Sequence, residues 1–271
     1  MITVAELCAH LDAAIPFAWA EEWDRVGLLV GDPSAVVTRV LVTLDATHSA
    51  LDRATAAGVN VVVTHHPAFL DPLGAVVAAQ GSAGVVFEAA RRDIALIACH
   101  TNLDRSPEGA DALARELGLE IVGALECREP DDRPDVPRAG RLCAAPDAGT
   151  LGDMAALVGR QLGVGTRIWG DPAARVSRVA LAPGSGRSLV DAAITAGADA
   201  LVTGELRYHV AHDAQERGLL VVEAGHDATE WPLTRALARL VGRADGLSPH
   251  DVEMDAVSYP WLTIAKGSEC T

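Results

Sequence analysis

The 271-residue sequence contains few aromatic residues and few cysteines. Aromatic side chains make up 4% of the chain while apolar residues make up 49%, so the core must be built mainly from alanine, valine and leucine. The five cysteines are odd in number and form no Cys-x-x-Cys pair. This argues against a disulfide framework and against a thiolate zinc site, and it favours a reducing cytosol.

Basic charge and long apolar runs are also scarce. The 37 acidic residues outnumber the 22 Lys and Arg residues, which gives a formal net charge of −15. A nucleic-acid partner requires a basic face, so none is expected. No run reaches the roughly 18 apolar residues of a membrane span. The amino terminus lacks the basic region and apolar core of a signal peptide. We therefore expect a cytoplasmic protein with no membrane partner.

The most informative stretch is VVVTHHPAF, residues 61–69. Its β-branched start predicts a strand that is buried on both faces. His65 and His66 would then stand at the carboxyl end of that strand, where open α/β sheets place their chemistry, and imidazole is a common metal ligand. An adjacent histidine pair is a weak motif by itself, and a capped loop with a surface histidine would explain it as well.

Further apolar runs alternate with helical segments, as in βαβ units. Residues 39–64 predict a strand, a helix and a second strand. Residues 94–104 predict another strand, with His100 and Asp104 toward its carboxyl end. A capping-box helix is predicted for residues 3–14.

The second half of the chain repeats the first. Residues 178–206 match residues 39–67 without a gap and keep helix, turn glycine and apolar strand at the same spacing. This ungapped match pairs His66 with Glu205. With one shift in the following loop, His100 pairs with His226 and Asp104 pairs with Glu230. We favour an internal duplication; chance similarity between βαβ units is the alternative.

The repeat predicts an α/β protein of two related lobes with a site in the cleft between them. The charged, Pro-rich stretch at 126–137 predicts a loop or linker. We expect a first lobe at residues 1–123, a short intermediate segment at 124–172 and a second lobe at 173–271.

Imidazoles and carboxylates dominate the polar strand ends, which favours zinc, manganese, iron, cobalt or nickel over calcium and magnesium. Neighbouring His65 and His66 diverge, so they serve two ions more easily than they chelate one. Asp104 and Glu230, one from each repeat, are placed to bridge two divalent ions. A metal pair roughly 3.5 to 4 Å apart activates water and stabilises an oxyanion, as hydrolysis requires.

Together these motifs resemble the Nif-three-like dinuclear-metal family, many of whose members are known as type 2 homologues of GTP cyclohydrolase I. The resemblance is carried by WDRVGLLVGDP at 23–33, LDAT at 44–47, THHPAF at 64–69, HTNLD at 100–104, TGELRYH at 203–209, GHDATE at 225–230 and SYPW at 258–261. It implies two metal ions held by His65, His66, Asp104, His226 and Glu230, with both carboxylates bridging. It also implies a homo-hexamer, arranged as a trimer of dimers.

The resemblance suggests a hydrolase for a small molecule, with a nucleotide such as GTP as the first candidate. His100 would lie beside the metals as an outer or additional ligand. His100, His209 and Glu205 are candidates for catalytic proton transfer, although surface roles would also explain the last two. The sequence contains no Gly-rich phosphate cradle. A non-catalytic metal-binding or metal-delivery protein would need the same five ligands and is the alternative.

Two positions depart from the family pattern. Arg25 stands where the family usually has Asn, and Asp227 stands where it usually has an aromatic residue. Neither is a predicted ligand, and Asp227 adds an acid next to the site. Trp23 and Asp24 are interpreted as packing and capping residues. The 124–172 interval is too short for the extra domain of longer relatives.

Overall fold

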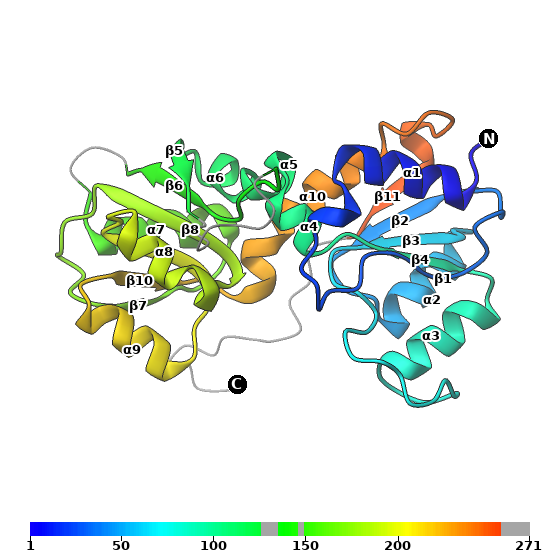
Figure 1. Ribbon diagram of the computed structural model, residues 1–271, viewed down its shortest axis with the longest axis horizontal. Coiled ribbons are helices and arrows are strands. Elements are labelled where there is room, and N and C mark those ends of the chain that lie inside the picture. The colour runs from blue at the N-terminus through cyan, green and yellow to red at the C-terminus, as the bar shows by residue number, and fades with distance from the viewer. Residues whose placement is uncertain (126–134, 146–148, 256–271) are drawn as a thin grey trace, which may run out of the picture.

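The computed structural model describes residues 1–125, 135–145 and 149–255, so the SYPW motif lies outside the described residues. Two mixed β-sheets lie side by side, with helix α10 (His226–Val241) between them (Figure 1). The strand orders are β1-β4-β3-β2-β11 and β5-β6-β8-β9-β10-β7. The predicted α/β class is therefore confirmed, in the form of two mixed sheets.

The first sheet has a parallel centre. Its strands are β1 (Gly27–Val30), β2 (Val40–Thr43), β3 (Val61–Thr64), β4 (Ala95–Ala98) and β11 (Val252–Met254). Strands β2, β3 and β4 are parallel and fully buried, whereas β1 is antiparallel to β4 at the edge. Successive residues of these strands point to opposite faces, and both faces are covered, which explains the unbroken apolar runs.

Helices cover the two faces of the first sheet. They are α1 (Val4–Ala14), η1 (Phe17–Trp19), α2 (His48–Ala56) and α3 (Ser82–Arg91). Helix α1 and the carboxyl half of α10 pack in one core cluster, while α2 and α3 pack in the other. The predicted capping box at the start of α1 is present, because the Thr3 hydroxyl accepts from the Glu6 amide and the Glu6 carboxylate accepts from the Thr3 amide.

The second sheet is built around a matching parallel core. Its strands are β5 (Glu120–Ala124), β6 (Arg141–Ala144), β7 (Arg167–Trp169), β8 (Arg178–Ser185), β9 (Ala200–Glu205) and β10 (Leu220–Glu223). Val40 pairs with Val61 across β2 and β3, and the residues that the repeat matches to them, Val179 and Ala200, pair across β8 and β9. The strand register thus agrees with the predicted duplication.

The remaining helices join the sheets or flank the second one. They are α4 (Thr101–Arg105), α5 (Pro107–Ala110), α6 (Ala112–Leu117), α7 (Leu151–Leu162), η2 (Gly186–Leu189), α8 (Val190–Thr195), α9 (Tyr208–Glu216) and η3 (Pro249–Asp251). Helix α10 contacts β8 and β9 as well as α1, β2 and β11, so it packs against both sheets. None of the described helices is both long and apolar enough to cross a bilayer.

The strands of the two sheets do not follow the order of the three predicted segments of the chain. Strand β5 belongs to the second sheet, although its residues were expected in the first lobe, because it pairs antiparallel with β6. Conversely, β11 closes the first sheet by pairing in parallel with β2. A three-residue strand such as β11 carries too little periodicity to be placed from sequence. The boundaries at 123 and 172 stay predictions.

Candidate metal centre

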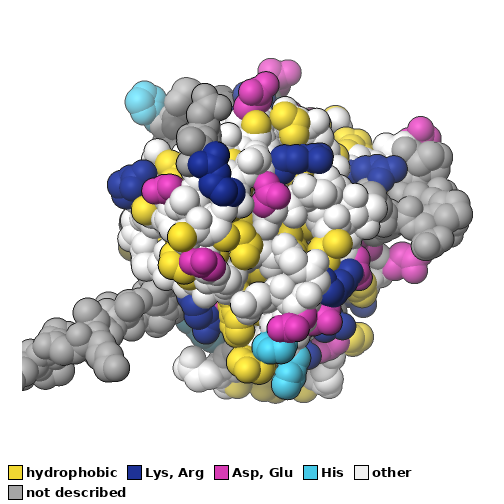
Figure 2. Space-filling view, turned by 90° about the vertical axis from the view of Figure 1, so that its left-hand side faces the viewer, with side chains coloured by type: hydrophobic (Ala, Val, Ile, Leu, Met, Phe, Trp, Pro, Cys, Tyr) yellow, Lys and Arg dark blue, Asp and Glu magenta, His cyan; other side chains and the backbone are white. Residues whose placement is uncertain are grey.

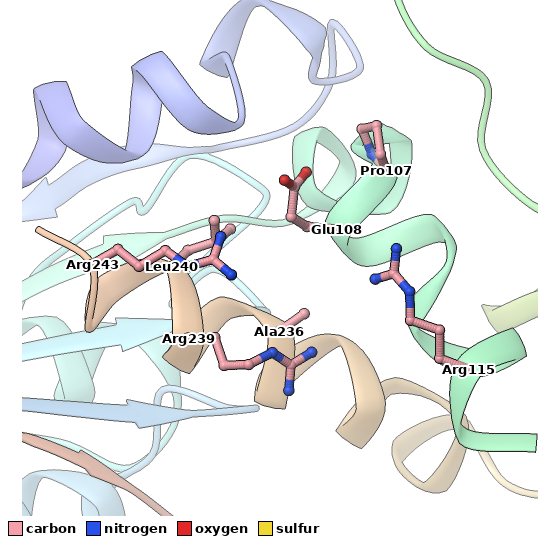
Figure 3. Close-up of a pocket in the computed structure, with 7 residues that line it drawn as sticks. All are labelled: Pro107, Glu108, Arg115, Ala236, Arg239, Leu240 and Arg243. Atoms are coloured by element: carbon pink, nitrogen blue, oxygen red, sulfur yellow. The ribbon is translucent and has the colours of Figure 1, made fainter. Parts of the chain in front are cut away.

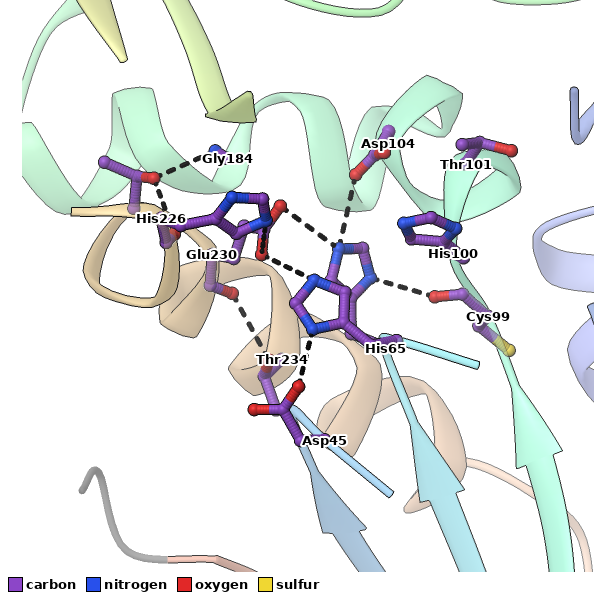
Figure 4. A network of polar contacts seen from close by, with 12 residues as sticks. Asp45, His65, Cys99, His100, Thr101, Asp104, Gly184, His226, Glu230 and Thr234 are labelled. Atoms are coloured by element: carbon purple, nitrogen blue, oxygen red, sulfur yellow. Dashed lines mark hydrogen bonds and ion pairs between the residues drawn. The ribbon is translucent and has the colours of Figure 1, made fainter. Parts of the chain in front are cut away.

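The histidine pair lies at the carboxyl end of the first sheet, next to α10. His65 and His66 directly follow β3, as predicted, and His100 follows β4. Strand β4 ends at Ala98, however, and Asp104 lies in helix α4 instead of in the predicted strand. Asp104 therefore approaches the cluster from a helix (Figure 4).

The second lobe supplies His226 and Glu230 from the start of α10. A spacing of four residues places both side chains on one face of the helix. Glu230 reaches across to the first lobe, where its Oε2 atom lies 2.9 Å from His66 Nε2 and 3.2 Å from His226 Nε2. His65 Nε2 lies 3.7 Å from Glu230 Oε1 and 3.6 Å from Asp104 Oδ1. The five predicted ligands are thus brought together (Figure 4).

Two groups of three residues have the spacing of a metal site. His65, His66 and His100 form one group, and His66, His226 and Glu230 form the other. In each group the ligand atoms lie within 4.8 Å of one another. His66 belongs to both, so the groups are adjacent, and the described residues contain two His and Glu clusters compatible with metal binding.

An oxygen atom holds the Nδ1 atom of every histidine in these groups. The acceptors are the Cys99 carbonyl for His65 at 3.0 Å, Asp45 for His66 at 2.8 Å, Asp24 for His100 at 2.8 Å and Glu205 for His226 at 3.2 Å. Because carbonyl and carboxylate oxygens only accept, each Nδ1 atom carries the proton of that contact. The Nε2 atom is then the free ligand atom, which is the usual arrangement of a metal-bound histidine.

Two buried polar atoms at the centre lack hydrogen bonds. His65 is fully buried, and its Nε2 atom has no hydrogen-bond partner among the described residues. The Oε2 atom of Glu230 is also without a hydrogen-bond partner among the described residues, although His66 Nε2 lies 2.9 Å from it. Leaving such a buried group unsatisfied costs about 1–3 kcal/mol. Coordination to a metal ion would satisfy both atoms, so the residues present fit the predicted ions.

The charges of the cluster also suit metal ions. Burial acts to lower the pKa of His66, but contacts with Asp45 and Glu230 outweigh it and raise that pKa to about 10. The contact with Glu230 is the largest effect on His226 and raises its pKa to about 9. Burial would raise the pKa of Glu230, yet the surrounding imidazoles hold it well below its usual value. Cations are therefore favoured around Glu230, and metal ions would replace protons there.

A glycine at the end of β8 makes room for this carboxylate. Gly184 has a φ of +63°, and a Cβ atom placed on it would lie 2.0 Å from Glu230 Oε1 and 3.1 Å from His226 Nε2. Its amide donates to the Thr229 hydroxyl at 2.9 Å, which holds the strand end against α10. Sequence reasoning did not select Gly184; the signal was a glycine at the carboxyl end of a predicted strand in the repeat.

Asp24 has a larger role than the one predicted. Its fully buried carboxylate accepts from the amide of Thr101 at 3.0 Å, so it caps α4, a helix distant in the sequence. It also accepts from His100 Nδ1 and thereby orients that imidazole. Trp23 is not a packing residue, because it is 56% exposed and its ring meets His100 edge-on at 6.0 Å.

Glu205 and His209 differ in their distance from the cluster. Glu205 is exposed and contacts His226 Nδ1, so it orients a predicted ligand. His209 is exposed on α9, where its ring lies beside Tyr208. It is not among the residues that line the cleft at the metal centre. Asp227 is half-buried, and its carboxylate accepts from the amide of Ala228 at 2.9 Å.

A cleft of about 780 Å³ opens beside the cluster and is lined by residues of both lobes. The candidate ligands Asp104, His226 and Glu230 line one end of it, and Trp23 also lines it. Arg187 also lines the cleft, and its side chain forms no hydrogen bond or ion pair with a described residue. The cleft therefore offers an aromatic face and an unpaired cation next to the candidate ligands.

Comparison with known proteins gives a consistent result. The model of the family described as Duf34/NIF3 (NGG1p interacting factor 3) matches residues 2–257. A protein of Streptomyces coelicolor named GTP cyclohydrolase 1 type 2 homolog is 38% identical over 237 residues, which cover 86% of this chain and 83% of the relative. A protein of Lactococcus lactis with the same name is 31% identical over 254 residues, which cover 92% of this chain and 93% of the relative.

A solved structure has a similar fold. It is that of a hypothetical protein of Staphylococcus aureus, with a TM-score of 0.85 and 28% sequence identity. The match covers 97% of this chain and 99% of that chain. The similarity therefore extends over both sheets.

Proposed function

The chain belongs to the Duf34/NIF3 family, and we propose that it is a hydrolase that depends on two divalent transition-metal ions. The observation that carries this proposal is the shared orientation of the histidines. The Nδ1 atoms of four histidines are held by oxygen atoms, while three Nε2 atoms surround the carboxylate of Glu230. Such an arrangement prepares nitrogen ligands for metal before the metal binds.

We assign His65, His66, Asp104, His226 and Glu230 as the ligands. The central position of Glu230 among imidazoles from both lobes supports a bridging role. Asp104 and Glu230 both approach His65 Nε2, at 3.6 Å and 3.7 Å, which supports a second bridge by Asp104. His100 belongs to the group formed with His65 and His66, so we propose it as an additional or outer ligand.

The neighbouring residues suit hydrolysis of a small anionic substrate. When bound, the two ions would lower the pKa of a water molecule and stabilise developing negative charge. His100 lies at the cleft with its Nδ1 atom fixed by Asp24, so its Nε2 atom is available to accept a proton. Arg187 would bind an anionic group, and Trp23 would contact a planar ring.

A nucleotide is the substrate class that we propose to test first. The names of the Streptomyces coelicolor and Lactococcus lactis relatives refer to a GTP cyclohydrolase. The aromatic face and the unpaired guanidinium of the cleft would suit a base and a phosphate group. Neither feature selects GTP among nucleotides, so a panel of purine and pyrimidine nucleotides is the appropriate first assay.

A non-catalytic metal-binding or metal-delivery protein is the second candidate. It is favoured by the positions of His209 and Glu205, because His209 does not line the cleft and Glu205 contacts His226 instead of open space. Only His100 then remains as a proton-transfer candidate. A delivery protein would need the ligands and an accessible cleft but no such residue.

Elemental analysis and a turnover assay on one preparation separate these possibilities. We expect about two transition-metal ions per chain, and we expect Glu230→Gln to lose both ions while His209→Ala, as a matched control, keeps them. Metal-free native protein would contradict the site. If the fully metallated chain leaves GTP, other nucleotides and simple phosphoesters unchanged but transfers metal to an acceptor, the delivery function is correct.

We also propose the homo-hexamer that the family resemblance implies. Sedimentation equilibrium tests it directly, because one chain has a mass of 28.2 kDa. A species of that mass at micromolar concentration would contradict the hexamer without affecting the metal assignment.

A further inference from the structure

A second pocket lies away from the metal centre, between α10 and the helices α5 and α6. It has a volume of about 300 Å³, and Figure 3 shows the side chains that surround it. The lining residues are Pro107, Glu108, Arg115, Ala236, Arg239, Leu240 and Arg243. Three of these seven side chains carry a guanidinium group, and Figure 3 shows those groups around the space between the helices.

The positive charge of this pocket is only partly balanced. Arg115 pairs with Asp111 at 2.9 Å, and the adjacent Arg235 pairs with Glu116 at 2.9 Å. The side chains of Arg239 and Arg243 form no hydrogen bond or ion pair with any residue that the structure describes. Burial, followed by repulsion from Arg115, Arg235 and Arg243, lowers the pKa of Arg239.

This clustering contrasts with the rest of the molecule. The chain carries a formal charge of −15, and on the end face of the second lobe basic and acidic side chains are interspersed (Figure 2). In the pocket, Glu108 is the one acidic side chain of the lining, which leaves a formal charge of +2. Arg115 and Arg243 repel Arg239, so an anion bound among these groups would lower the free energy of the folded chain.

The shape and chemistry of the pocket indicate which anion fits. Guanidinium groups bind phosphate oxygens through pairs of parallel hydrogen bonds. The buried side chains of Ala236 and Leu240 form the apolar part of the lining, and the three arginines around them are exposed. The pocket is too small for a folded partner and large enough for a phosphate group with a few further atoms.

We propose that the pocket between α10 and α5–α6 is a binding site for the phosphate group of a small molecule, separate from the metal centre. A phosphate held by Arg115 on α6 and by Arg239 and Arg243 at the end of α10 would join these helices. Helix α10 also carries His226 and Glu230, and α5 follows directly after Asp104 of α4. The bound anion would therefore stabilise the elements that position ligands from both lobes.

The test is calorimetric titration of the full chain, as purified, at constant ionic strength. Inorganic phosphate and glycerol phosphate are the probes, and acetate is the carboxylate comparison. We expect one phosphate site per chain in addition to any phosphate bound at the metals. The double variant Arg239→Gln with Arg243→Gln should weaken that site about tenfold or more, because two charge-assisted contacts are lost. Arg160→Gln, which changes an exposed arginine on α7, should leave it unchanged.

The affinities of the two probes identify the natural ligand. Tighter binding of inorganic phosphate would indicate free phosphate, and tighter binding of glycerol phosphate would indicate a phosphate ester. Unchanged phosphate binding by the double variant would overturn the proposal, as would equally tight binding of acetate. If the wild type binds no phosphate and the double variant alters the oligomeric state, the arginines contact a second copy and the proposal is also wrong.

Urea unfolding provides an independent readout. Without phosphate, Arg239→Gln should be at least as stable as the wild type, because the substitution removes like-charge repulsion. Phosphate should raise the midpoint of unfolding more for the wild type and for Arg160→Gln than for Arg239→Gln. A phosphate-dependent rise of equal size in all three proteins would reflect a general salt effect and would overturn the proposal.

Discussion

Gly184 offers a sharp test of how tightly β8 packs against the metal centre. An alanine at this position would be strained, because the backbone φ is +63°, and its Cβ atom would lie 2.0 Å from Glu230 Oε1. The strained backbone costs about 1–2 kcal/mol for a residue with a Cβ atom. Forcing an extra methyl group into a packed site costs about 1–3 kcal/mol more. We therefore expect Gly184→Ala to lower the free energy of unfolding by about 2–5 kcal/mol.

Gly58→Ala is the matched control. Gly58 has a φ of +67°, close to that of Gly184, but a Cβ atom placed on it would meet nothing within 4 Å. This variant should show the backbone strain alone, about 1–2 kcal/mol. The difference between the two variants then measures the clash with Glu230.

The two variants should also differ in metal content. Gly184→Ala can fold only if Glu230 moves, which takes its carboxylate away from His66 and His226. We expect Gly58→Ala to keep about two ions per chain and Gly184→Ala to lose them, as measured by elemental analysis and urea unfolding. Full metal content in Gly184→Ala, together with a stability equal to that of Gly58→Ala, would refute this account of the site.

Three further predictions concern charges around the site and in the second sheet. Asp45→Asn should lower metal affinity about 10- to 100-fold, because the imidazole of His66 loses the charged acceptor of its Nδ1 atom. Titration calorimetry measures this affinity, and an unchanged value would exclude His66 as a ligand. Chelation should lower the thermal midpoint of the wild type but not of Glu230→Gln, since metal bound to the folded chain stabilises it; equal shifts would indicate metal bound elsewhere. Glu223 is buried, and although burial raises its pKa, Arg167, Trp169 and the Leu206 amide outweigh this and lower it. A carboxyl group whose pKa is lowered by folding stabilises the folded chain at pH values above its ordinary pKa of 4.5, and this stability is lost as the pH falls through the pKa of the folded state. In urea unfolding, the wild type should therefore lose more stability than Glu223→Gln between pH 6 and 3. Parallel losses would contradict this.

The parts of the fold that sequence could predict are those with a strong local signal. The valine runs of β2 and β3 require burial on both faces, and the Thr3 and Glu6 pair fixes the start of α1. Long-range pairing has no such signal, so the attachment of β11 to β2 and of β5 to β6 could not be inferred. The strand predicted at 94–104 extends past the observed end of β4 at Ala98 for the same reason. Asp24, from a distant segment, caps the helix α4 that follows β4.

The sequence could predict which side chains meet at the candidate site, but not the residues that hold them in place. His65, His66 and Asp104 were selected because their residue types and positions match a known motif. Asp45 and Gly184 occupy matching positions in the two copies of the repeat, but a carboxylate or a glycine at a strand end has many uses. Their roles depend on distances across the interface of the two lobes, which one sequence does not contain.

The duplication also explains why the described residues form one candidate metal centre between the lobes instead of one in each lobe. The repeat matches His65 to Gly204, which lies at the carboxyl end of β9. A Cβ atom on Gly204 would lie 2.6 Å from the His226 Cα atom and 2.6 Å from the Gly184 carbonyl oxygen. The second lobe therefore has no space for a histidine at the position where the first lobe has one.

Helix α10 occupies that space. The strand pairs Thr64 with Ala98 and Thr203 with Glu223 make His100 equivalent to Gly225 in the backbone, one residue before His226. The match of His100 with His226 needed a shift in the sequence because it pairs two residues of the same type that do not share a backbone position. The second lobe has a glycine in place of the strand-end histidine and supplies His226 and Glu230 from α10, so the two lobes together form the cluster between them.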